Sequence, residues 1–190
     1  MVGGLSSRNK NRPAYPIVER ITIIPIGLVE GPVVDFLSHR LPEVFGKKVE
    51  KGSRIQKPHF AYNEKRRQYL VDAILLKLAQ IRDSVRGRVL GVTEVDLYRQ
   101  DGRSVFGHAN RERKVAVVST KRLQDEYYGL TGNLEKLEER VLKEAIHHLG
   151  DTYGLKGCAN PLCAMFDTSQ LLDLDIKKPV LCSGCKRAIP

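Results

Sequence analysis

Four cysteines near the end of the chain have the spacing of a metal site. They form two close pairs, Cys158 with Cys163 and Cys182 with Cys185, and they are the only cysteines in the sequence. Two short loops that each supply two thiolates are a common way to surround a tetrahedral zinc ion. The pattern therefore predicts one structural zinc, in preference to free or disulfide-bonded cysteines. A closed four-thiolate site leaves no coordination position for a substrate.

A second group of chemically active residues lies just upstream, at His147, His148 and Asp151. Residues four apart share a helix face, so His147 and Asp151 would be positioned to bind the same metal. Two protein ligands alone predict weak binding. His148 could accept a proton, but a general base without a metal accelerates a reaction only about 10²–10⁴-fold. One alternative is that the two histidines bind no metal. Another is that Glu144 and His147 are a ligand pair of a di-iron site, but the chain has no second copy of that pair.

The order of these residues resembles the signature of the archaemetzincins, a family of metzincin zinc metalloproteases. Its pattern is H-E-x-x-H-x-x-G-x-x-H-C-x4-C-x-M-x17-C-x2-C. The chain agrees at His147, Gly154, Met165 and all four cysteines, with sixteen residues instead of seventeen before Cys182. Segments 91–98 and 106–109 are also similar to the family's central strand and the segment after it. The resemblance spans roughly residues 20–187.

The resemblance implies a peptide hydrolase with a cleft along an edge strand and Met165 beneath the catalytic metal. Three positions depart from the signature: His148 replaces the catalytic Glu, and Asp151 and Gly157 replace the second and third zinc-binding His. We therefore expect an impaired or inactive homologue in which the catalytic zinc is absent or weakly held by His147 and Asp151. The alternative is a non-catalytic protein that binds peptides or a partner. A working protease would need an unexpected ligand such as His108 or His59.

Apolar periodicity predicts an α/β fold with a mixed sheet and at least two covering helices, and the resemblance implies that this sheet is twisted. Strands are expected at 20–27, 47–55, 88–97, 105–107 and 114–120. Helices are expected at 32–45, which Pro42 would shorten or end, at 65–85, and at 134–153 between the capping residues Asn133 and Gly154. We expect a flexible tail at 1–15, an α/β subdomain at 16–154 and a small zinc-bound subdomain at 155–190.

The charge distribution argues against a nucleic-acid-binding zinc ribbon. The net charge is +10 over residues 1–130 and zero over residues 131–190, where the cysteines lie. Basic residues are not interleaved with aromatic residues around the cysteines either. No apolar stretch approaches the roughly 18 residues that a membrane span needs, and the first residues lack a secretory signal. We therefore predict a cytoplasmic protein that contacts no membrane and has a peptide or protein partner.

Overall fold

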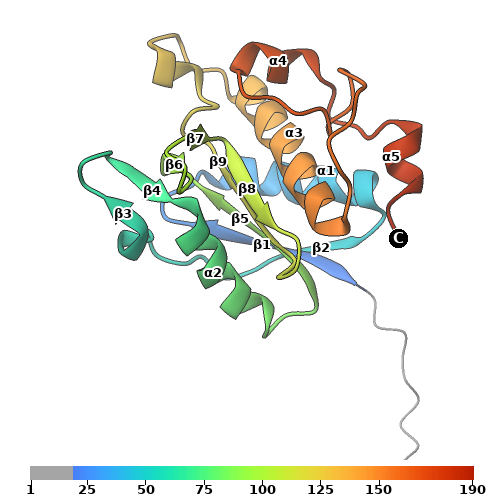
Figure 1. The fold of residues 1–190 in the computed structure, drawn as a ribbon, viewed down its shortest axis with the longest axis horizontal. Helices are drawn as coiled ribbons and strands as arrows, with labels where there is room; N and C mark the ends of the chain where they lie inside the picture. Colours follow the sequence, from blue (N-terminus) through green and yellow to red (C-terminus); the bar gives the residue numbers. More distant parts are fainter. Residues whose placement is uncertain (1–18) are drawn as a thin grey trace, which may run out of the picture.

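The computed structural model describes residues 19–190, and its centre is a five-stranded mixed sheet with the order β2-β1-β5-β9-β8 (Figure 1). The first four strands are parallel, and β8 runs antiparallel to β9 at one edge. The predicted fold class is confirmed, while the expected tail at 1–15 lies outside the described residues. The strands are β1 Arg20–Ile26, β2 Lys48–Lys51, β5 Gly87–Thr93, β8 Gly107–Asn110 and β9 Val115–Ser119.

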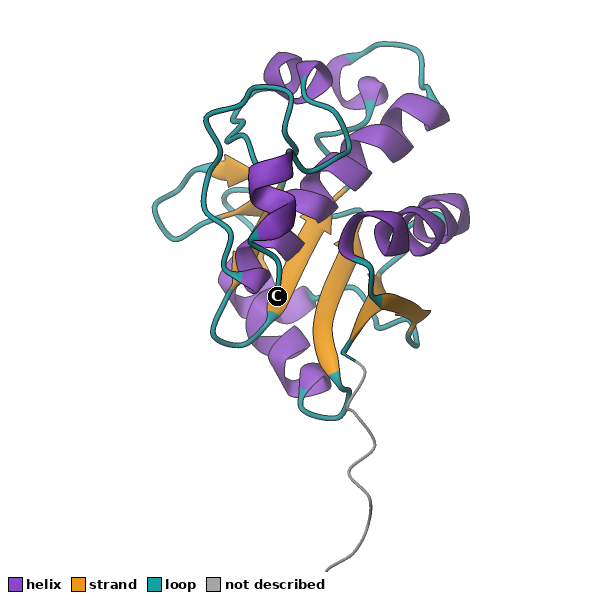
Figure 2. Ribbon diagram, turned by 90° about the vertical axis from the view of Figure 1, so that its right-hand side faces the viewer, coloured by secondary structure: helices purple, strands orange, loops and turns teal. Residues whose placement is uncertain are grey.

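Helices cover both faces of this sheet (Figures 1 and 2). Helices α1 (Gly31–Phe45) and α3 (Leu134–Tyr153) pack on one face, and α2 (Val71–Arg82) packs on the other. Successive strand residues point to opposite faces, so Ile21 and Ile23 join the α1 and α3 core, whereas Ile24 and Ile26 join the α2 core. Burial on both faces explains the continuous apolar run in β1.

Helix α3 has the bounds that its sequence predicts, because both of its ends are set locally. The Asn133 side chain accepts a hydrogen bond from the backbone N–H of Lys136 and so caps the first turn. Gly154 ends the helix in the left-handed conformation, with φ of +92°. Helix α3 carries His147, His148 and Asp151, so these caps also fix the position of the candidate site.

The predicted helix over 65–85 is wrong in its first six residues. A hairpin of β3 (Tyr62–Asn63) and β4 (Gln68–Leu70) precedes α2, and the helix starts only at Val71. These strands form a second sheet with β6 (Leu97–Tyr98) and β7 (Ser104–Val105), in the order β3-β4-β6-β7. Strand β4 pairs with β6 some 28 residues later in sequence, from Tyr69 to Leu97. Such long-range pairing overrides the local helical pattern.

Two other expectations about the ends of elements are not met. The strand predicted over 88–97 stops at Thr93, and Leu97 belongs to β6 in the second sheet. Pro42 was expected to shorten or end α1, but it lies inside the helix, which continues to Phe45 and is capped by Gly46 with φ of +62°. Leu41 and Phe45 are buried on either side of the proline, so core packing holds this last turn.

Residues 155–190 are rich in loops and contain two short helices, α4 (Leu171–Ile176) and α5 (Ser183–Arg187), which lie beside α3 (Figure 1). Ala164 and Leu174 are fully buried in the main core. This segment therefore packs against α3 as well as around its own cysteines, and its status as a separate subdomain stays a prediction. Among the described residues, no helix combines the length and apolar character needed to cross a membrane.

Arg140 fastens α4 to the middle of α3. Its guanidinium is 2% exposed and donates to both carboxylate oxygens of Asp175, at 2.7 and 2.6 Å. It also donates to Asp125 at 2.7 Å and to the Leu123 carbonyl at 2.8 Å. One buried cation therefore links two separate segments, one at 123–125 and the other in α4, to the helix.

Replacing Arg140 with Ala should destabilise the fold by about 3 kcal/mol, because it removes the link to Asp175 and leaves the largely buried Asp125 with Lys136 as its remaining cationic partner. Chemical denaturation measures this loss directly. Arg40→Ala is the matched control, since Arg40 makes a similar ion pair with Glu43 on the exposed face of α1. That control should cost about 1 kcal/mol or less. Equal losses in the two variants would contradict the assigned role of Arg140.

Candidate metal centre and cleft

His147, His148 and Asp151 project together from α3. Each offers one ligand atom, and these three atoms all lie within 4.8 Å of one another. The Nε2 atom of His147 is 3.9 Å from Oδ2 of Asp151, so the two positions predicted to share a helix face do converge. They come together because they are one turn apart on a helix whose opposite side is packed in the core.

The His147 ring is oriented by the loop that follows α3. Its Nδ1 lies 3.2 Å from the carbonyl oxygen of Ala164, which can only accept a hydrogen bond, so Nδ1 is the donor. The Nε2 atom then presents its lone pair to the cleft. Burial, followed by the neighbouring His148, lowers the pKa of His147. A neutral ring held through its other nitrogen is the usual state of a metal-binding histidine.

His148 is held in a different way, between two carboxylates. Its Nε2 is 3.4 Å from Glu144 and its Nδ1 is 3.4 Å from Asp151, so both nitrogens act as donors. Burial opposes a charge on this ring, but the bonds to Asp151 and Glu144 outweigh it and raise the pKa of His148 to about 9. The two carboxylates therefore favour the imidazolium form of His148, in which neither nitrogen has a free lone pair.

The backbone of edge strand β8 passes directly over the His148 ring. A Cβ atom at Gly107 would lie 2.5 Å from Cδ2 and 2.8 Å from Nε2 of that ring. Only glycine leaves room for the imidazole at this distance. Strand β8 thus covers His148 and keeps its side chain 11% exposed.

Glu144 and Lys177 complete a buried ionic network that the sequence did not reveal. The Lys177 ammonium is fully buried and donates to Glu144 at 3.2 Å and to the carbonyls of Ala164 and Phe166 at 3.1 and 3.3 Å. Burial would raise the pKa of Glu144, but His148 and Lys177 outweigh it and hold that pKa below its usual value. Glu144 had been considered only for its spacing from His147, and nothing in the sequence around Lys177 marks it as buried.

Asp167 occupies the space left by the third signature position. Gly157 has no side chain, and a Cβ added there would lie 2.4 Å from Oδ2 of Asp167. The other carboxylate oxygen of Asp167 is 3.5 Å from Nε2 of His147. This residue was not predicted, because it is ten positions from Gly157 and reaches it only through the fold of the loop.

Met165 packs against the backbone of α3 between His147 and Asp151. Its side chain is fully buried, and its sulfur lies 2.3 Å from where a Cβ at Gly150 would stand. The helix therefore needs glycine at position 150 to accept the methionine. The loop is further fixed by a hydrogen bond of 2.9 Å from the Cys158 N–H to the Met165 carbonyl.

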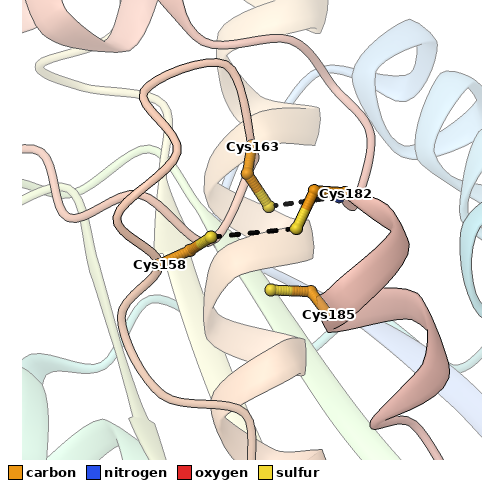
Figure 3. Close-up of side chains that lie close together, drawn as sticks. All are labelled: Cys158, Cys163, Cys182 and Cys185. Carbon is orange, nitrogen blue, oxygen red and sulfur yellow. Dashed lines mark hydrogen bonds between the residues drawn. The ribbon is translucent and has the colours of Figure 1, made fainter.

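The four cysteines converge on one point beside α3 (Figure 3). Their sulfur atoms all lie within 4.8 Å of one another, and those of Cys158 and Cys182 are 3.8 Å apart. Zinc–sulfur bonds of about 2.3 Å place tetrahedral sulfurs about 3.8 Å apart, so this group fits a zinc ion. A hydrogen bond from the backbone N–H of Cys182 to the sulfur of Cys163, at 3.3 Å, favours the thiolate form that zinc requires.

The two histidines open onto a cleft of about 770 Å³ between β8 and the loop after Met165. His108 on β8 also lines this cleft, but it lies outside the candidate metal group at His147, His148 and Asp151. His59 lies in the short 3-10 helix His59–Ala61 and does not line this cleft. Arginines line part of the wall, namely Arg99, Arg103 and Arg122.

The sequence profile of Peptidase family M54 matches residues 34–190. The archaemetzincin of Methanocaldococcus jannaschii is 39% identical over 173 residues, which cover 91% of this chain and 94% of that protein. The archaemetzincin of Pyrococcus furiosus is 37% identical over 90% of this chain and 92% of its own length. The chain belongs to the archaemetzincin family. The resemblance read from the cysteines, Met165 and His147 is thereby confirmed.

Solved archaemetzincin structures share this fold. The crystal structure from Archaeoglobus fulgidus, complexed with malonate, has a TM-score of 0.75 and 32% identity, covering 90% of this chain and 99% of that one. A zinc-dependent peptidase from Methanocorpusculum labreanum gives a TM-score of 0.84 at 28% identity, over 90% of this chain and all of that chain. The archaemetzincin scaffold is therefore present over nearly the whole described chain, including the segment that carries the departures from the signature.

Replacing Cys182 with Ser should release zinc and loosen residues from about 158 onward. Three remaining ligands bind far more weakly, and a structural zinc contributes on the order of 10 kcal/mol to the folding of a small metal-dependent segment. Metal analysis and thermal unfolding of the purified variant measure both effects. Ser183→Ala, at the exposed neighbouring position, should change neither. If the cysteine variant keeps its zinc and its melting temperature, these thiolates are not the ligands.

Proposed function

We propose that this archaemetzincin homologue binds extended peptides in its cleft without hydrolysing them. The observation that carries the proposal is the state of His148, which stands where the family signature has its catalytic Glu. A metallopeptidase needs a base there to take the proton from metal-bound water. Both nitrogens of His148 lie 3.4 Å from carboxylate oxygens, one of Glu144 and one of Asp151, so neither presents a free lone pair to the cleft. It cannot serve as that base.

The ligand set supports the same conclusion. Three imidazoles hold the catalytic zinc in the family signature, whereas this chain supplies one at His147, with Asp151 in the second position and Gly157 in the third. A weaker and less positive Lewis acid centre polarises a peptide carbonyl less strongly. Peptide hydrolysis requires rate enhancements far beyond what binding and proximity alone provide.

Peptide binding is supported by the geometry of the cleft wall. Among the described residues, β8 pairs with β9 on one side only, so its other side offers backbone donors and acceptors. An extended peptide can add to such an edge as a further strand. The cleft of about 770 Å³ beside β8 has room for side chains of the bound segment.

Two structural roles belong to the same proposal. We assign one structural zinc to Cys158, Cys163, Cys182 and Cys185, in support of the loops that flank the cleft. We assign to Met165 the family's role of a hydrophobic floor beneath the metal position, on the strength of its packing against Gly150. Both roles preserve the shape of the cleft, and neither supplies catalytic chemistry.

The unmodified protein should bind fluorescent extended peptides but show no cleavage that a chelator abolishes. Anisotropy measures the binding, and mass spectrometry of the same incubations detects cleavage. Turnover that stops with a chelator and returns with zinc would refute the non-hydrolytic assignment. The absence of peptide binding across a random-sequence pool would refute the binding assignment instead.

Restoring the signature should rebuild a second zinc site. The double variant Asp151→His with Gly157→His supplies three imidazoles, provided that positions 147, 151 and 157 converge. Asp167 must move aside, and it can do so because its side chain is 81% exposed. Metal analysis should then give two zinc ions per chain, against one for the control Asp151→His alone. A folded double variant with a single zinc would show that the three positions do not converge.

Adding His148→Glu to that double variant supplies the missing base. We expect chelator-sensitive hydrolysis to become detectable only in this triple variant. Hydrolysis by the double variant alone would mean that His148 is no obstacle to catalysis, and the central observation of the proposal would fail.

A further inference from the structure

Three arginines line one wall of the cleft. Arg99 follows β6, Arg103 precedes β7, and Arg122 comes shortly after the end of β9. The backbone N–H of Arg99 donates to the Arg103 carbonyl at 2.9 Å, so the turn between β6 and β7 keeps these two residues together. This wall therefore carries three positive charges.

Two of these charges are already paired within the protein. Arg122 donates to both carboxylate oxygens of Asp96, at 2.6 and 3.0 Å. Arg103 donates twice to one oxygen of Asp101, at 3.0 and 2.7 Å. An anion that approached either arginine would have to compete with a carboxylate that the protein supplies.

Arg99 differs from its neighbours because it has no such partner. Within residues 19–190, its guanidinium has neither a carboxylate at ion-pair distance nor a hydrogen-bond partner. It is half-buried and borders an adjoining hollow, where Asp101 is bonded to Arg103 and Asp72 lies in the first turn of α2. The positive N-terminal end of that helix stabilises the Asp72 charge. Arg99 is therefore a partly dehydrated cation that can receive an anion from outside.

Arg99 also stands close to the strand along which a peptide would bind. After burial, its charge is the next cause that lowers the pKa of His108, which lies on β8 and lines the cleft. The acidic groups of the cleft are placed elsewhere, since Glu144 is held in its buried ionic network and Asp167 faces His147 at 3.5 Å. A peptide on the free edge of β8 would therefore meet a cation that no described acidic group contacts.

We propose that Arg99 makes the cleft selective for peptides that present a carboxylate, from an acidic side chain or from the peptide C-terminus. This inference rests on the proposed peptide binding and names the class of peptide that binds. A guanidinium suits this task because its planar fork can donate two parallel hydrogen bonds to one carboxylate. The positive charges of Arg103 and Arg122 disfavour basic peptides at the same wall.

Three fluorescent peptides of one length test the selectivity by anisotropy. The first has Glu at alternate positions and an amidated C-terminus, the second has Gln instead and is also amidated, and the third has Gln and a free C-terminus. Alternate side chains of an extended peptide point the same way, so one set can face Arg99. We expect the Glu peptide to bind about tenfold more tightly than the amidated Gln peptide, as one charge-assisted hydrogen bond allows. Added salt should reduce this difference, because the contact is partly exposed.

Arg99→Gln should abolish the preference without weakening the amidated Gln peptide, since it removes the charge and keeps a long polar side chain. Arg86→Gln is the matched control, because Arg86 is exposed in the loop between α2 and β5 and does not line the cleft. It should keep the full preference. Circular dichroism checks that both variants are folded.

A preference for Glu that is lost in Arg99→Gln and kept in Arg86→Gln supports the proposal. Tight binding of the free C-terminus alone, with the same loss in Arg99→Gln, also supports it and assigns the carboxylate to the end of the peptide. Equal affinity for all three peptides would overturn the selectivity and leave peptide binding intact, whereas no binding of any peptide would overturn both. Equal loss in the two variants would show that the preference follows net charge and does not depend on Arg99.

Discussion

The buried ammonium of Lys177 is the contact on which the geometry of the cleft depends. It lies under the loop that follows Cys163 and donates to Glu144 of α3 and to the carbonyls of Ala164 and Phe166. The Ala164 carbonyl also receives the Nδ1 proton of His147. One buried cation therefore fixes the loop that orients His147, seats Met165 and carries Asp167. Removing it would leave Glu144 charged and buried beside His148 alone, which is costly in a low-dielectric interior.

The charged side chains around α3 differ from those that the family signature places there. In the signature, a zinc ion and a carboxylate base stand at this point. In this chain, the side chains of His148 and Lys177 lie beside the carboxylates of α3 and are covalently part of the protein. The acidic groups are thereby neutralised in the absence of the family's three-imidazole zinc.

The sequence predicted best those features that depend on local interactions. The ends of α3 follow from Asn133 and Gly154, and the convergence of the cysteines follows from two short loops whose spacing suits one metal ion. The hairpin of β3 and β4 was missed because its pairing with β6 comes from a distant segment. Lys177 and Asp167 were missed for the same physical reason. Their roles arise only once the loop after Met165 has folded back on α3, and no periodicity or spacing records that contact.

Three glycines show which features of the family's site are retained in this chain and which differ. Gly107 lets β8 pass over the His148 ring, and Gly150 lets Met165 reach the helix backbone, so both maintain close packing around the metal position. Gly157 serves the opposite purpose, because its missing side chain vacates a ligand position that Asp167 then occupies. The packing that shapes an archaemetzincin site can thus persist while its donors change. Shape is fixed by the close approach of side chains to the backbone at Gly107 and Gly150, which only glycine permits, whereas the donor positions of the signature are not bound by that restriction.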